Sequence, residues 1–157
     1  MHGRVVIPVH DQRGALVAYV GRSIDNTQPR YRFPSGFRKS LELYNLHRCS
    51  GMSVVLVEGF FDTLSVVQAG FDAVALMGVA LSERQKGMLI HRFSEVVLLL
   101  DGDAAGRRAT DHIGEMLRHA IRLRVGMVPD GRQPDCLRAD EITEIVRKAV
   151  TLNGRRP

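Results

Sequence analysis

The sequence of 157 residues lacks the features that mark membrane, secreted and disulfide-rich proteins. It has no tryptophan and only two cysteines, Cys49 and Cys136, neither of which belongs to a C-x-x-C pattern. This argues against a disulfide framework or a structural zinc site and predicts a reducing, cytoplasmic location. No apolar run approaches the roughly 20 residues that a membrane helix needs. Residues 1–10 lack the character of a signal peptide, so no membrane partner is expected.

Lysine is also scarce, because only three of the 22 basic residues are lysines and the rest are arginines. With 17 acidic residues the formal net charge is +5, which favours an anionic partner such as nucleic acid or nucleotide. Arginine suits this role because it binds phosphate oxygens through two hydrogen bonds. A codon bias toward arginine would give the same composition. No G-x-x-x-x-G-K-[ST] motif occurs, so P-loop ATP hydrolysis is not indicated.

The first third of the chain is β-rich and basic. Short β-branched runs at 5–9 and 16–20 flank a turn ending at Gly14, which predicts a hairpin. Residues 21–40 are interrupted by Pro29, Pro34 and Gly36, and such residues are typical of irregular connections. We therefore expect a small β lobe with an irregular extension.

The remainder alternates between apolar runs and helical patterns with short connections, which predicts an α/β fold with a largely parallel sheet flanked by helices. The expected strands cover 54–57, 73–76, 96–100 and 121–128, and the expected helices cover 60–70, 82–91, 104–120 and 140–150.

Acidic residues follow two of these strands at the point where each strand ends. Glu58 comes directly after the first strand, with Asp62 four residues on, and Asp101 and Asp103 come directly after the third. Sites in open α/β sheets form beyond the carboxyl ends of the strands, and neighbouring strands lie about 4.8 Å apart. Carboxylates so close repel one another unless they are protonated or bridged by a cation. Oxygen ligands of this kind select Mg²⁺ or Mn²⁺.

This pattern leaves other interpretations open. An acid after a strand is often only a helix N-cap, and Asp103 is placed to cap the helix at 104–120 while still facing a metal ion. A D-x-D sequence after a strand also occurs in haloacid-dehalogenase-type phosphatases and sugar-nucleotide transferases. Spacing alone does not choose among these chemistries.

Two motifs narrow the choice. Val55–Asp62 and Leu100–Gly106 resemble the Toprim domain, which is shared by topoisomerases, bacterial-type primases, OLD-type nucleases and certain recombination proteins. Further segments resemble the bacterial-type (DnaG-like) DNA primase branch of that family, and they are 3–11, 21–22, 37–46, 68–71, 77–82 and 128–135. The resemblance covers about residues 3–140. It implies a Toprim (Rossmann-like) sheet and synthesis of short RNA primers on single-stranded DNA from ribonucleoside triphosphates.

The resemblance also implies domain boundaries and residue roles. Residues 1–50 match the C-terminal part of the basic lobe, 51–139 the Toprim catalytic domain, and 140–157 the start of a C-terminal helical segment with a frayed tail. The acids that match catalytic and metal-binding positions are Glu58, Asp101 and Asp103, and those that match further metal-binding positions are Asp62 and Asp135.

Basic residues are expected to bind nucleotide or template phosphates. Arg22 and Lys39 match basic positions of the family, Arg30 lies between them, and Arg107 follows the D-x-D turn closely. Aromatic residues are interleaved with arginines over 22–48, which fits base stacking on a single strand. The alternative is that these aromatics pack beneath an irregular loop while the charges face solvent.

One position departs from the family pattern. Primases usually have Asp-Pro-Asp downstream, whereas this chain has Gln133-Pro134-Asp135, which removes one negative charge. Occupancy by a second or third metal ion is therefore in question. The alternatives to a primase core are a strand-cleaving Toprim nuclease or topoisomerase and a catalytically impaired nucleic-acid or nucleotide-binding module. The length indicates either the core of a larger protein, which would engage a replicative helicase through other segments, or a minimal stand-alone relative.

Overall fold

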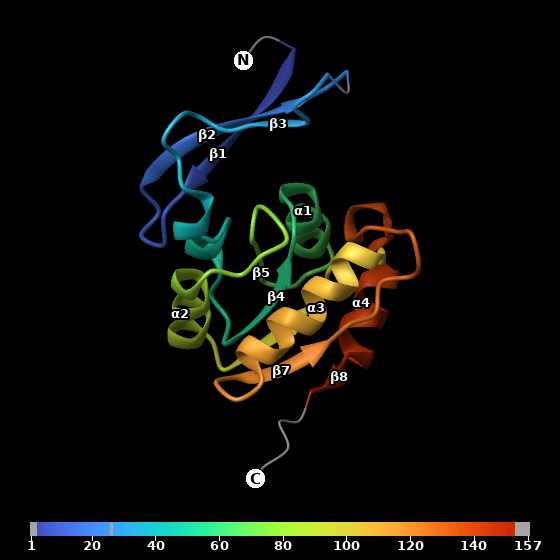
Figure 1. Ribbon diagram of the computed structural model, residues 1–157. Helices are drawn as coiled ribbons and strands as arrows, with labels where there is room; N and C mark the ends of the chain where they lie inside the picture. Colours follow the sequence, from blue (N-terminus) through green and yellow to red (C-terminus); the bar gives the residue numbers. More distant parts are fainter. Residues whose placement is uncertain (1–2, 26, 153–157) are drawn as a thin grey trace.

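The computed structural model describes residues 3–25 and 27–152, which form two sheets (Figure 1). The first sheet is antiparallel, with the order β1 (Arg4–His10), β2 (Leu16–Ser23), β3 (Tyr31–Arg32). Its hairpin is the predicted one, and Gly14 supplies the left-handed backbone conformation, φ +85°, that the turn requires. The segment predicted as irregular is partly wrong, because β2 continues to Ser23 and β3 pairs with it.

The second sheet has five strands in the order β5-β4-β6-β7-β8, of which the first four are parallel as predicted. The short edge strand β8 was not predicted and runs antiparallel to β7. The strands are β4 (Ser53–Val57), β5 (Ala73–Ala75), β6 (Glu95–Leu98), β7 (Arg122–Val125) and β8 (Val150–Thr151). The helices are α1 (Phe60–Gln68), α2 (Glu83–Arg92), α3 (Ala104–Leu117) and α4 (Ala139–Lys148), with 3₁₀ turns η1 (Lys39–Leu41), η2 (Leu46–Arg48) and η3 (Pro134–Cys136).

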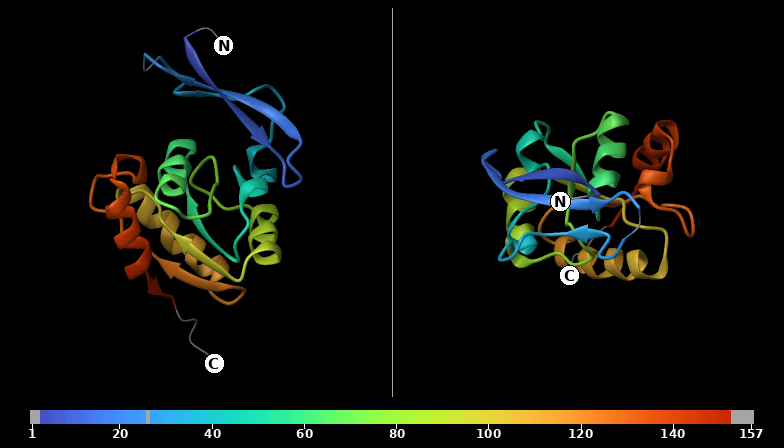
Figure 2. Two further views of the ribbon diagram at one scale, coloured as in Figure 1. Left: turned by 180° about the vertical axis from the view of Figure 1, so that it is seen from behind. Right: turned by 90° about the horizontal axis from the view of Figure 1, so that it is seen from above.

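The second sheet is covered on both faces by helices (Figure 2). Side chains alternate along each strand, so Leu56 and Leu98 pack toward α2 and α3, whereas Val55 and Val97 pack toward α1 and α4. Helix α4 belongs to this core through its buried isoleucine, Ile142. The predicted division of the chain at residues 50 and 139 stays a prediction. Over the residues that the structure describes, no helix is long and apolar enough to cross a membrane.

Helix α2 begins at the predicted capping box. The Ser82 hydroxyl accepts a hydrogen bond from the Gln85 amide at 3.0 Å, and the Gln85 side chain accepts one from the Ser82 amide at 3.0 Å. Gln85 is fully buried and also donates to the carbonyl of Glu42 at 2.8 Å. This residue therefore both starts the helix and holds the chain that leads in from the first sheet.

Aromatic packing joins the two sheets. Phe60, the first residue of α1, is 2% exposed and contacts Tyr31 and Tyr44, with ring centroids 5.4 and 4.7 Å away. Phe33 lies 6.4 Å from the same ring. The predicted alternative of packing beneath the irregular segment is thus confirmed for these aromatics, and base stacking stays a prediction. Phe60 is the centre of the contact between the lobes.

We predict that Phe60→Ala lowers the free energy of unfolding by about 3 to 5 kcal/mol, because it empties the aromatic cluster between the two sheets. Denaturant unfolding measures the change. The matched control is Leu64→Ala on the same helix, where the side chain is 47% exposed and the expected loss is under about 1 kcal/mol. Equal losses for the two variants would contradict the role of Phe60.

Candidate active site

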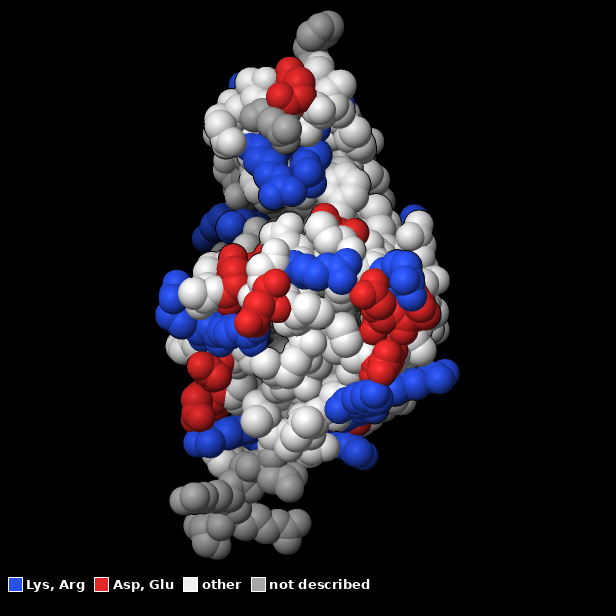
Figure 3. All heavy atoms as spheres, turned by 90° about the vertical axis from the view of Figure 1, so that its right-hand side faces the viewer, with Lys and Arg blue, Asp and Glu red and all other residues white. Residues whose placement is uncertain are grey.

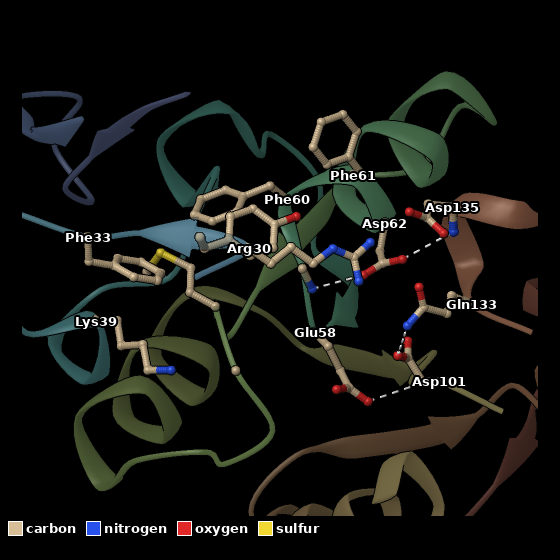
Figure 4. A pocket seen from close by; sticks show the side chains of 14 residues that line it. Arg30, Phe33, Lys39, Glu58, Phe60, Phe61, Asp62, Asp101, Gln133 and Asp135 are labelled. Carbon is tan, nitrogen blue, oxygen red and sulfur yellow. Dashed lines mark hydrogen bonds between the residues drawn. The ribbon is translucent and has the colours of Figure 1, made fainter. Parts of the chain in front are cut away.

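Glu58 and Asp101, two of the acids predicted at the sheet edge, lie beside each other there (Figure 4). Strands β4 and β6 are parallel neighbours with Leu56 opposite Leu98, so the residues that follow them leave the sheet side by side. The backbone amide of Asp101 donates a hydrogen bond to Glu58 Oε1 at 3.2 Å. Parallel pairing therefore brings together two acids that are 43 residues apart in the sequence.

Asp62 connects the start of α1 to η3. Its Oδ2 accepts a hydrogen bond from the Gly59 amide at 2.9 Å, and its Oδ1 accepts one from the Asp135 amide at 3.1 Å. The side chain is only 8% exposed. The two outlying acids of the predicted set are thus neighbours, and both line the same cavity as Glu58 and Asp101.

Gln133 makes a contact that the sequence did not reveal. Its Nε2 donates to Asp101 Oδ2 at 2.6 Å. The other oxygen, Asp101 Oδ1, is buried and has no hydrogen-bond partner among the described residues. The sequence showed that position 133 is neutral where the family usually has Asp. It could not show that Gln133 contacts Asp101, because the two residues are 32 positions apart and meet only in the tertiary structure.

Cations from the first third of the chain face these acids across a cavity of about 250 Å³. Arg30 and Lys39 lie in its wall together with aromatic side chains, including Phe33, whose ring centroid is 5.8 Å from Lys39 Nζ. The cavity therefore has an acidic wall from the second sheet and a basic, aromatic wall from the lobe (Figure 4).

Three predicted site residues lie outside this cavity wall. Asp103 caps α3, accepting from the Gly106 amide at 2.7 Å, which confirms the N-cap interpretation. The Arg22 guanidinium lies 4.7 Å from the centroid of the Phe61 ring and donates to the Tyr31 hydroxyl at 2.8 Å. Arg107 forms an ion pair with Asp130.

Burial and mutual repulsion raise the pKa values of the acids in the cavity. Burial first, and then the neighbouring Asp101, raises the pKa of Glu58 to about 7. Burial first, and then Asp101 and Asp135, raises the pKa of Asp62 to about 6. Burial also raises the pKa of Asp101, although the hydrogen bond from Gln133 opposes the shift. At neutral pH the cluster is therefore under electrostatic stress that a bound cation would relieve.

The donor set fits a divalent cation. All the side chains are hard oxygen donors, and Asp101 Oδ1 is a buried acceptor without a partner. In residues 3–25 and 27–152, no three His, Cys, Asp or Glu side chains already form a group that could hold a metal ion. A cation bound between Glu58 and Asp101 would offset the repulsion between their carboxylates.

A tight backbone contact fixes the turn that carries Asp101. The amide of Gly102 donates to the carbonyl of Arg132 at 2.9 Å, and the amide of Gly131 donates to the carbonyl of Gly102 at 2.9 Å. A Cβ atom at Gly102 would lie 2.0 Å from the carbonyl oxygen of Pro129. Only glycine fits this approach, which holds the loop of Gln133 against the loop of Asp101.

Comparison with known proteins agrees with the fold. Residues 55–137 match a family model described as Toprim-like, and residues 1–50 match one described as the N-terminal domain of the DNA primase catalytic core. The chain therefore belongs to the Toprim-like family.

Its relatives are primases. The chain is 35% identical to a DNA primase of Clostridium acetobutylicum over 84% of its own length, and 32% identical to one of Pseudomonas aeruginosa over 94%. A crystal structure of a DNA primase domain from Pseudomonas aeruginosa superposes with a TM-score of 0.83 at 31% identity, covering 96% of this chain and 53% of that one. The resemblance to bacterial-type primases is thus confirmed. The chain spans about a quarter of the length of these curated relatives, 24% in both cases.

We predict that Gly102→Ala disrupts the site, because the added methyl group meets backbone that cannot move without separating the two loops. The expected loss in the free energy of unfolding is about 2 to 4 kcal/mol. The control is Gly87→Ala in α2, where the new Cβ meets open space and the expected change is a gain of about 0.5 to 1 kcal/mol. Thermal unfolding distinguishes the two, and a stable Gly102→Ala protein would contradict the close approach.

We predict that Glu58→Gln stabilises the metal-free protein at pH 8. A carboxyl group whose pKa rises from its ordinary 4.5 to about 7 on folding favours the folded state below pH 4.5, and this advantage is lost as the pH rises through 7. Glutamine keeps the acceptor for the Asp101 amide and carries no charge. Because Glu58 is partly exposed, the expected gain in the free energy of unfolding at pH 8 is about 1 to 2 kcal/mol, and this gain vanishes near pH 4.

Denaturant unfolding in a chelating buffer at several pH values measures this difference. The control is Glu144→Gln, which removes a carboxylate paired only with Lys148 on the exposed surface of α4. A Glu58→Gln protein whose stability relative to the parent is the same at pH 4 and pH 8 would show that Glu58 is not repelled in the folded state.

Proposed function

We propose that this chain is the catalytic core of a DNA primase, which synthesises short RNA primers on single-stranded DNA. One observation carries the proposal: Glu58 and Asp101 meet at the ends of adjacent parallel strands, and the buried Asp101 Oδ1 has no hydrogen-bond partner in the part of the chain that the structure describes. Such an arrangement suits a site that neutralises phosphate charge through a cation. The similarity of the whole chain to primase cores supports this choice among Toprim activities.

Glu58, Asp101 and Asp103 are the residues that would hold Mg²⁺ or Mn²⁺, on which Toprim primases generally depend. A metal ion held by these residues would supply neutralisation of the incoming triphosphate and activation of the attacking 3′-hydroxyl. Oε1 of Glu58 accepts a hydrogen bond from the Asp101 amide, so Oε2 is the oxygen that is placed to hold or move a proton. Asp62 already accepts two backbone hydrogen bonds, so we assign it and Asp135 to the outer part of the metal site.

The basic wall would hold the phosphates. Arg30 and Lys39 face the acids directly, so they are assigned to the triphosphate or to the growing primer. Arg22, stacked on the aromatics beside the cavity, and Arg107, beside the D-x-D turn, are assigned to the template backbone. A related primase catalytic domain, superposing at a TM-score of 0.82 with 28% identity, has been solved bound to single-stranded DNA.

The distribution of charge supports this division. Residues 1–50 contain eight basic and three acidic residues, whereas residues 51–157 contain fourteen of each. The whole net charge of +5 therefore arises in the first section. In Figure 3 acidic and basic side chains lie beside one another over the larger lower part, while a basic patch lies on the small lobe near its junction with that part. A polyanion would be drawn to the lobe.

The chain would act in the cytoplasm, where a reducing environment suits its two free cysteines. We expect weak activity from the chain alone, because its relatives are about four times as long. A replicative helicase would be engaged through segments outside the region that matches.

We predict that the chain incorporates labelled ribonucleotides on a single-stranded DNA template with Mg²⁺ or Mn²⁺, and that Asp101→Asn lowers the rate at least about a hundredfold. The substitution keeps the side-chain shape and removes the charge that would hold the metal. The control is Asp140→Asn, which removes an exposed carboxylate that is paired with Arg138 and is not part of the cavity wall. Template-directed synthesis that survives Asp101→Asn would refute the assigned site.

The same preparation separates the alternatives. Nicking of supercoiled plasmid with Mg²⁺ and no nucleotides would favour a strand-cleaving Toprim enzyme over a primase. Binding of single-stranded DNA and nucleoside triphosphate without incorporation, in the presence of either metal, would favour a catalytically impaired binding module. Activity with neither metal would contradict the metal-dependent mechanism.

A further inference from the structure

Gln133 divides the acids of the cavity into two groups (Figure 4). On one side are Glu58 and Asp101, joined through the Asp101 amide. On the other are Asp62 and Asp135, joined through the Asp135 amide. The Gln133 side chain lies between the groups, with its amide nitrogen directed at Asp101.

The backbone holds Gln133 in this place. It is the residue before η3, and its carbonyl accepts from the Cys136 amide at 3.0 Å. The preceding residue, Arg132, accepts the hydrogen bond from Gly102 in the turn of Asp101. The amide therefore approaches Asp101 from a loop anchored on both sides, which makes the 2.6 Å contact a fixed property of the site.

This contact leaves one oxygen of Asp101 for a ligand. Oδ2 is engaged by Gln133, and the buried Oδ1 has no partner in the described chain. A side chain that donates a hydrogen bond to a ligating carboxylate sets the orientation of that carboxylate and strengthens its binding to metal. Gln133 thus orients Asp101 so that a single carboxylate oxygen, Oδ1, stays available to a ligand.

The neutral amide also replaces a charge. A carboxylate at position 133 would face Asp101 at hydrogen-bonding distance, and two ionised carboxylates at that distance require a cation between them. Glutamine satisfies Asp101 Oδ2 with a proton donor instead, so the space between Asp101 and Asp135 needs no ion. The amide of Gln133 therefore explains both the missing negative charge at position 133 and the single oxygen, Oδ1, that Asp101 leaves unpartnered in the described residues.

We propose that Gln133 is a positioning residue that takes the place of a second divalent cation, so that the site binds a single ion on the side of Gln133 where Glu58 and Asp101 lie. The inference rests on the proposed metal-dependent function but concerns metal binding alone. Gln133 acts through Asp101 and would not contact the ion that Asp101 binds.

We predict that the full chain, without nucleotide or DNA, binds one Mn²⁺ ion and that Gln133→Glu binds two. Glutamate has the shape of glutamine and places a second carboxylate beside Asp101, where a second ion would neutralise the pair. Gln133→Leu, which removes the hydrogen bond at similar volume, still binds one ion but about tenfold more weakly, because Asp101 is no longer oriented. Mn²⁺ electron paramagnetic resonance gives the number of bound ions, and isothermal titration gives the affinity.

The control is Gln12→Glu, which makes the same charge change in the exposed turn between β1 and β2 and is expected to leave binding unchanged. Two ions in the unaltered protein, or one ion in a folded Gln133→Glu, would overturn the proposal. Should Gln133→Glu fail to fold by circular dichroism, the comparison of the parent with Gln133→Leu decides, and equal affinities refute it. The result is independent of primer synthesis, so failure of the proposed activity leaves this inference separately testable.

Discussion

Mutual repulsion among carboxylates at the ends of β4 and β6 is the constraint on which the rest of the structure depends. The parallel register delivers Glu58 and Asp101 to one edge, and the fold compensates with neutral N–H donors. Backbone amides bind Glu58 and Asp62, and a side-chain amide binds Asp101. No arginine pairs with these three acids among the described residues. Since none of these three acids forms an ion pair with Arg30 or Lys39 in the described residues, both cations stay available to an anionic ligand and the acids stay available to a cation.

The two parts of the chain also differ in how their basic side chains are used. In the second part, arginines are largely used in local ion pairs, such as Arg118 with Glu115 at 2.7 Å and Arg122 with Glu95 at 3.0 Å. In the described residues before position 83 there is no such pair. A neutral scaffold thus carries the acidic site, and a lobe with unneutralised cations lies across from it. Exposed ion pairs add little stability, so leaving the lobe unpaired costs the fold little.

Much of the fold followed from the sequence, because burial patterns in parallel strands and helix caps are local signals. The capping box at Ser82 and the meeting of Glu58 with Asp101 needed only periodicity and the rule that parallel strands end at one edge. The edge strand β8 was missed because two exposed residues carry no pattern. The contact of Gln133 with Asp101 was missed for a different reason: it depends on how two distant loops pack. Sequence reasoning therefore located the acids and left open how each is held.

The packing of those loops explains why the acidic half of the site behaves as one unit. Gly102 allows two backbone hydrogen bonds between the Asp101 turn and the loop that carries Gln133 and Asp135. The acids are thereby positioned relative to one another by main-chain contacts, which are insensitive to side-chain rotamers. The basic half is attached differently, through the aromatic cluster around Phe60 and a backbone bridge between Tyr44 and Ala75. The positions of the acids thus depend on backbone contacts between two loops, whereas the positions of the cations depend on the aromatic contact between the two sheets.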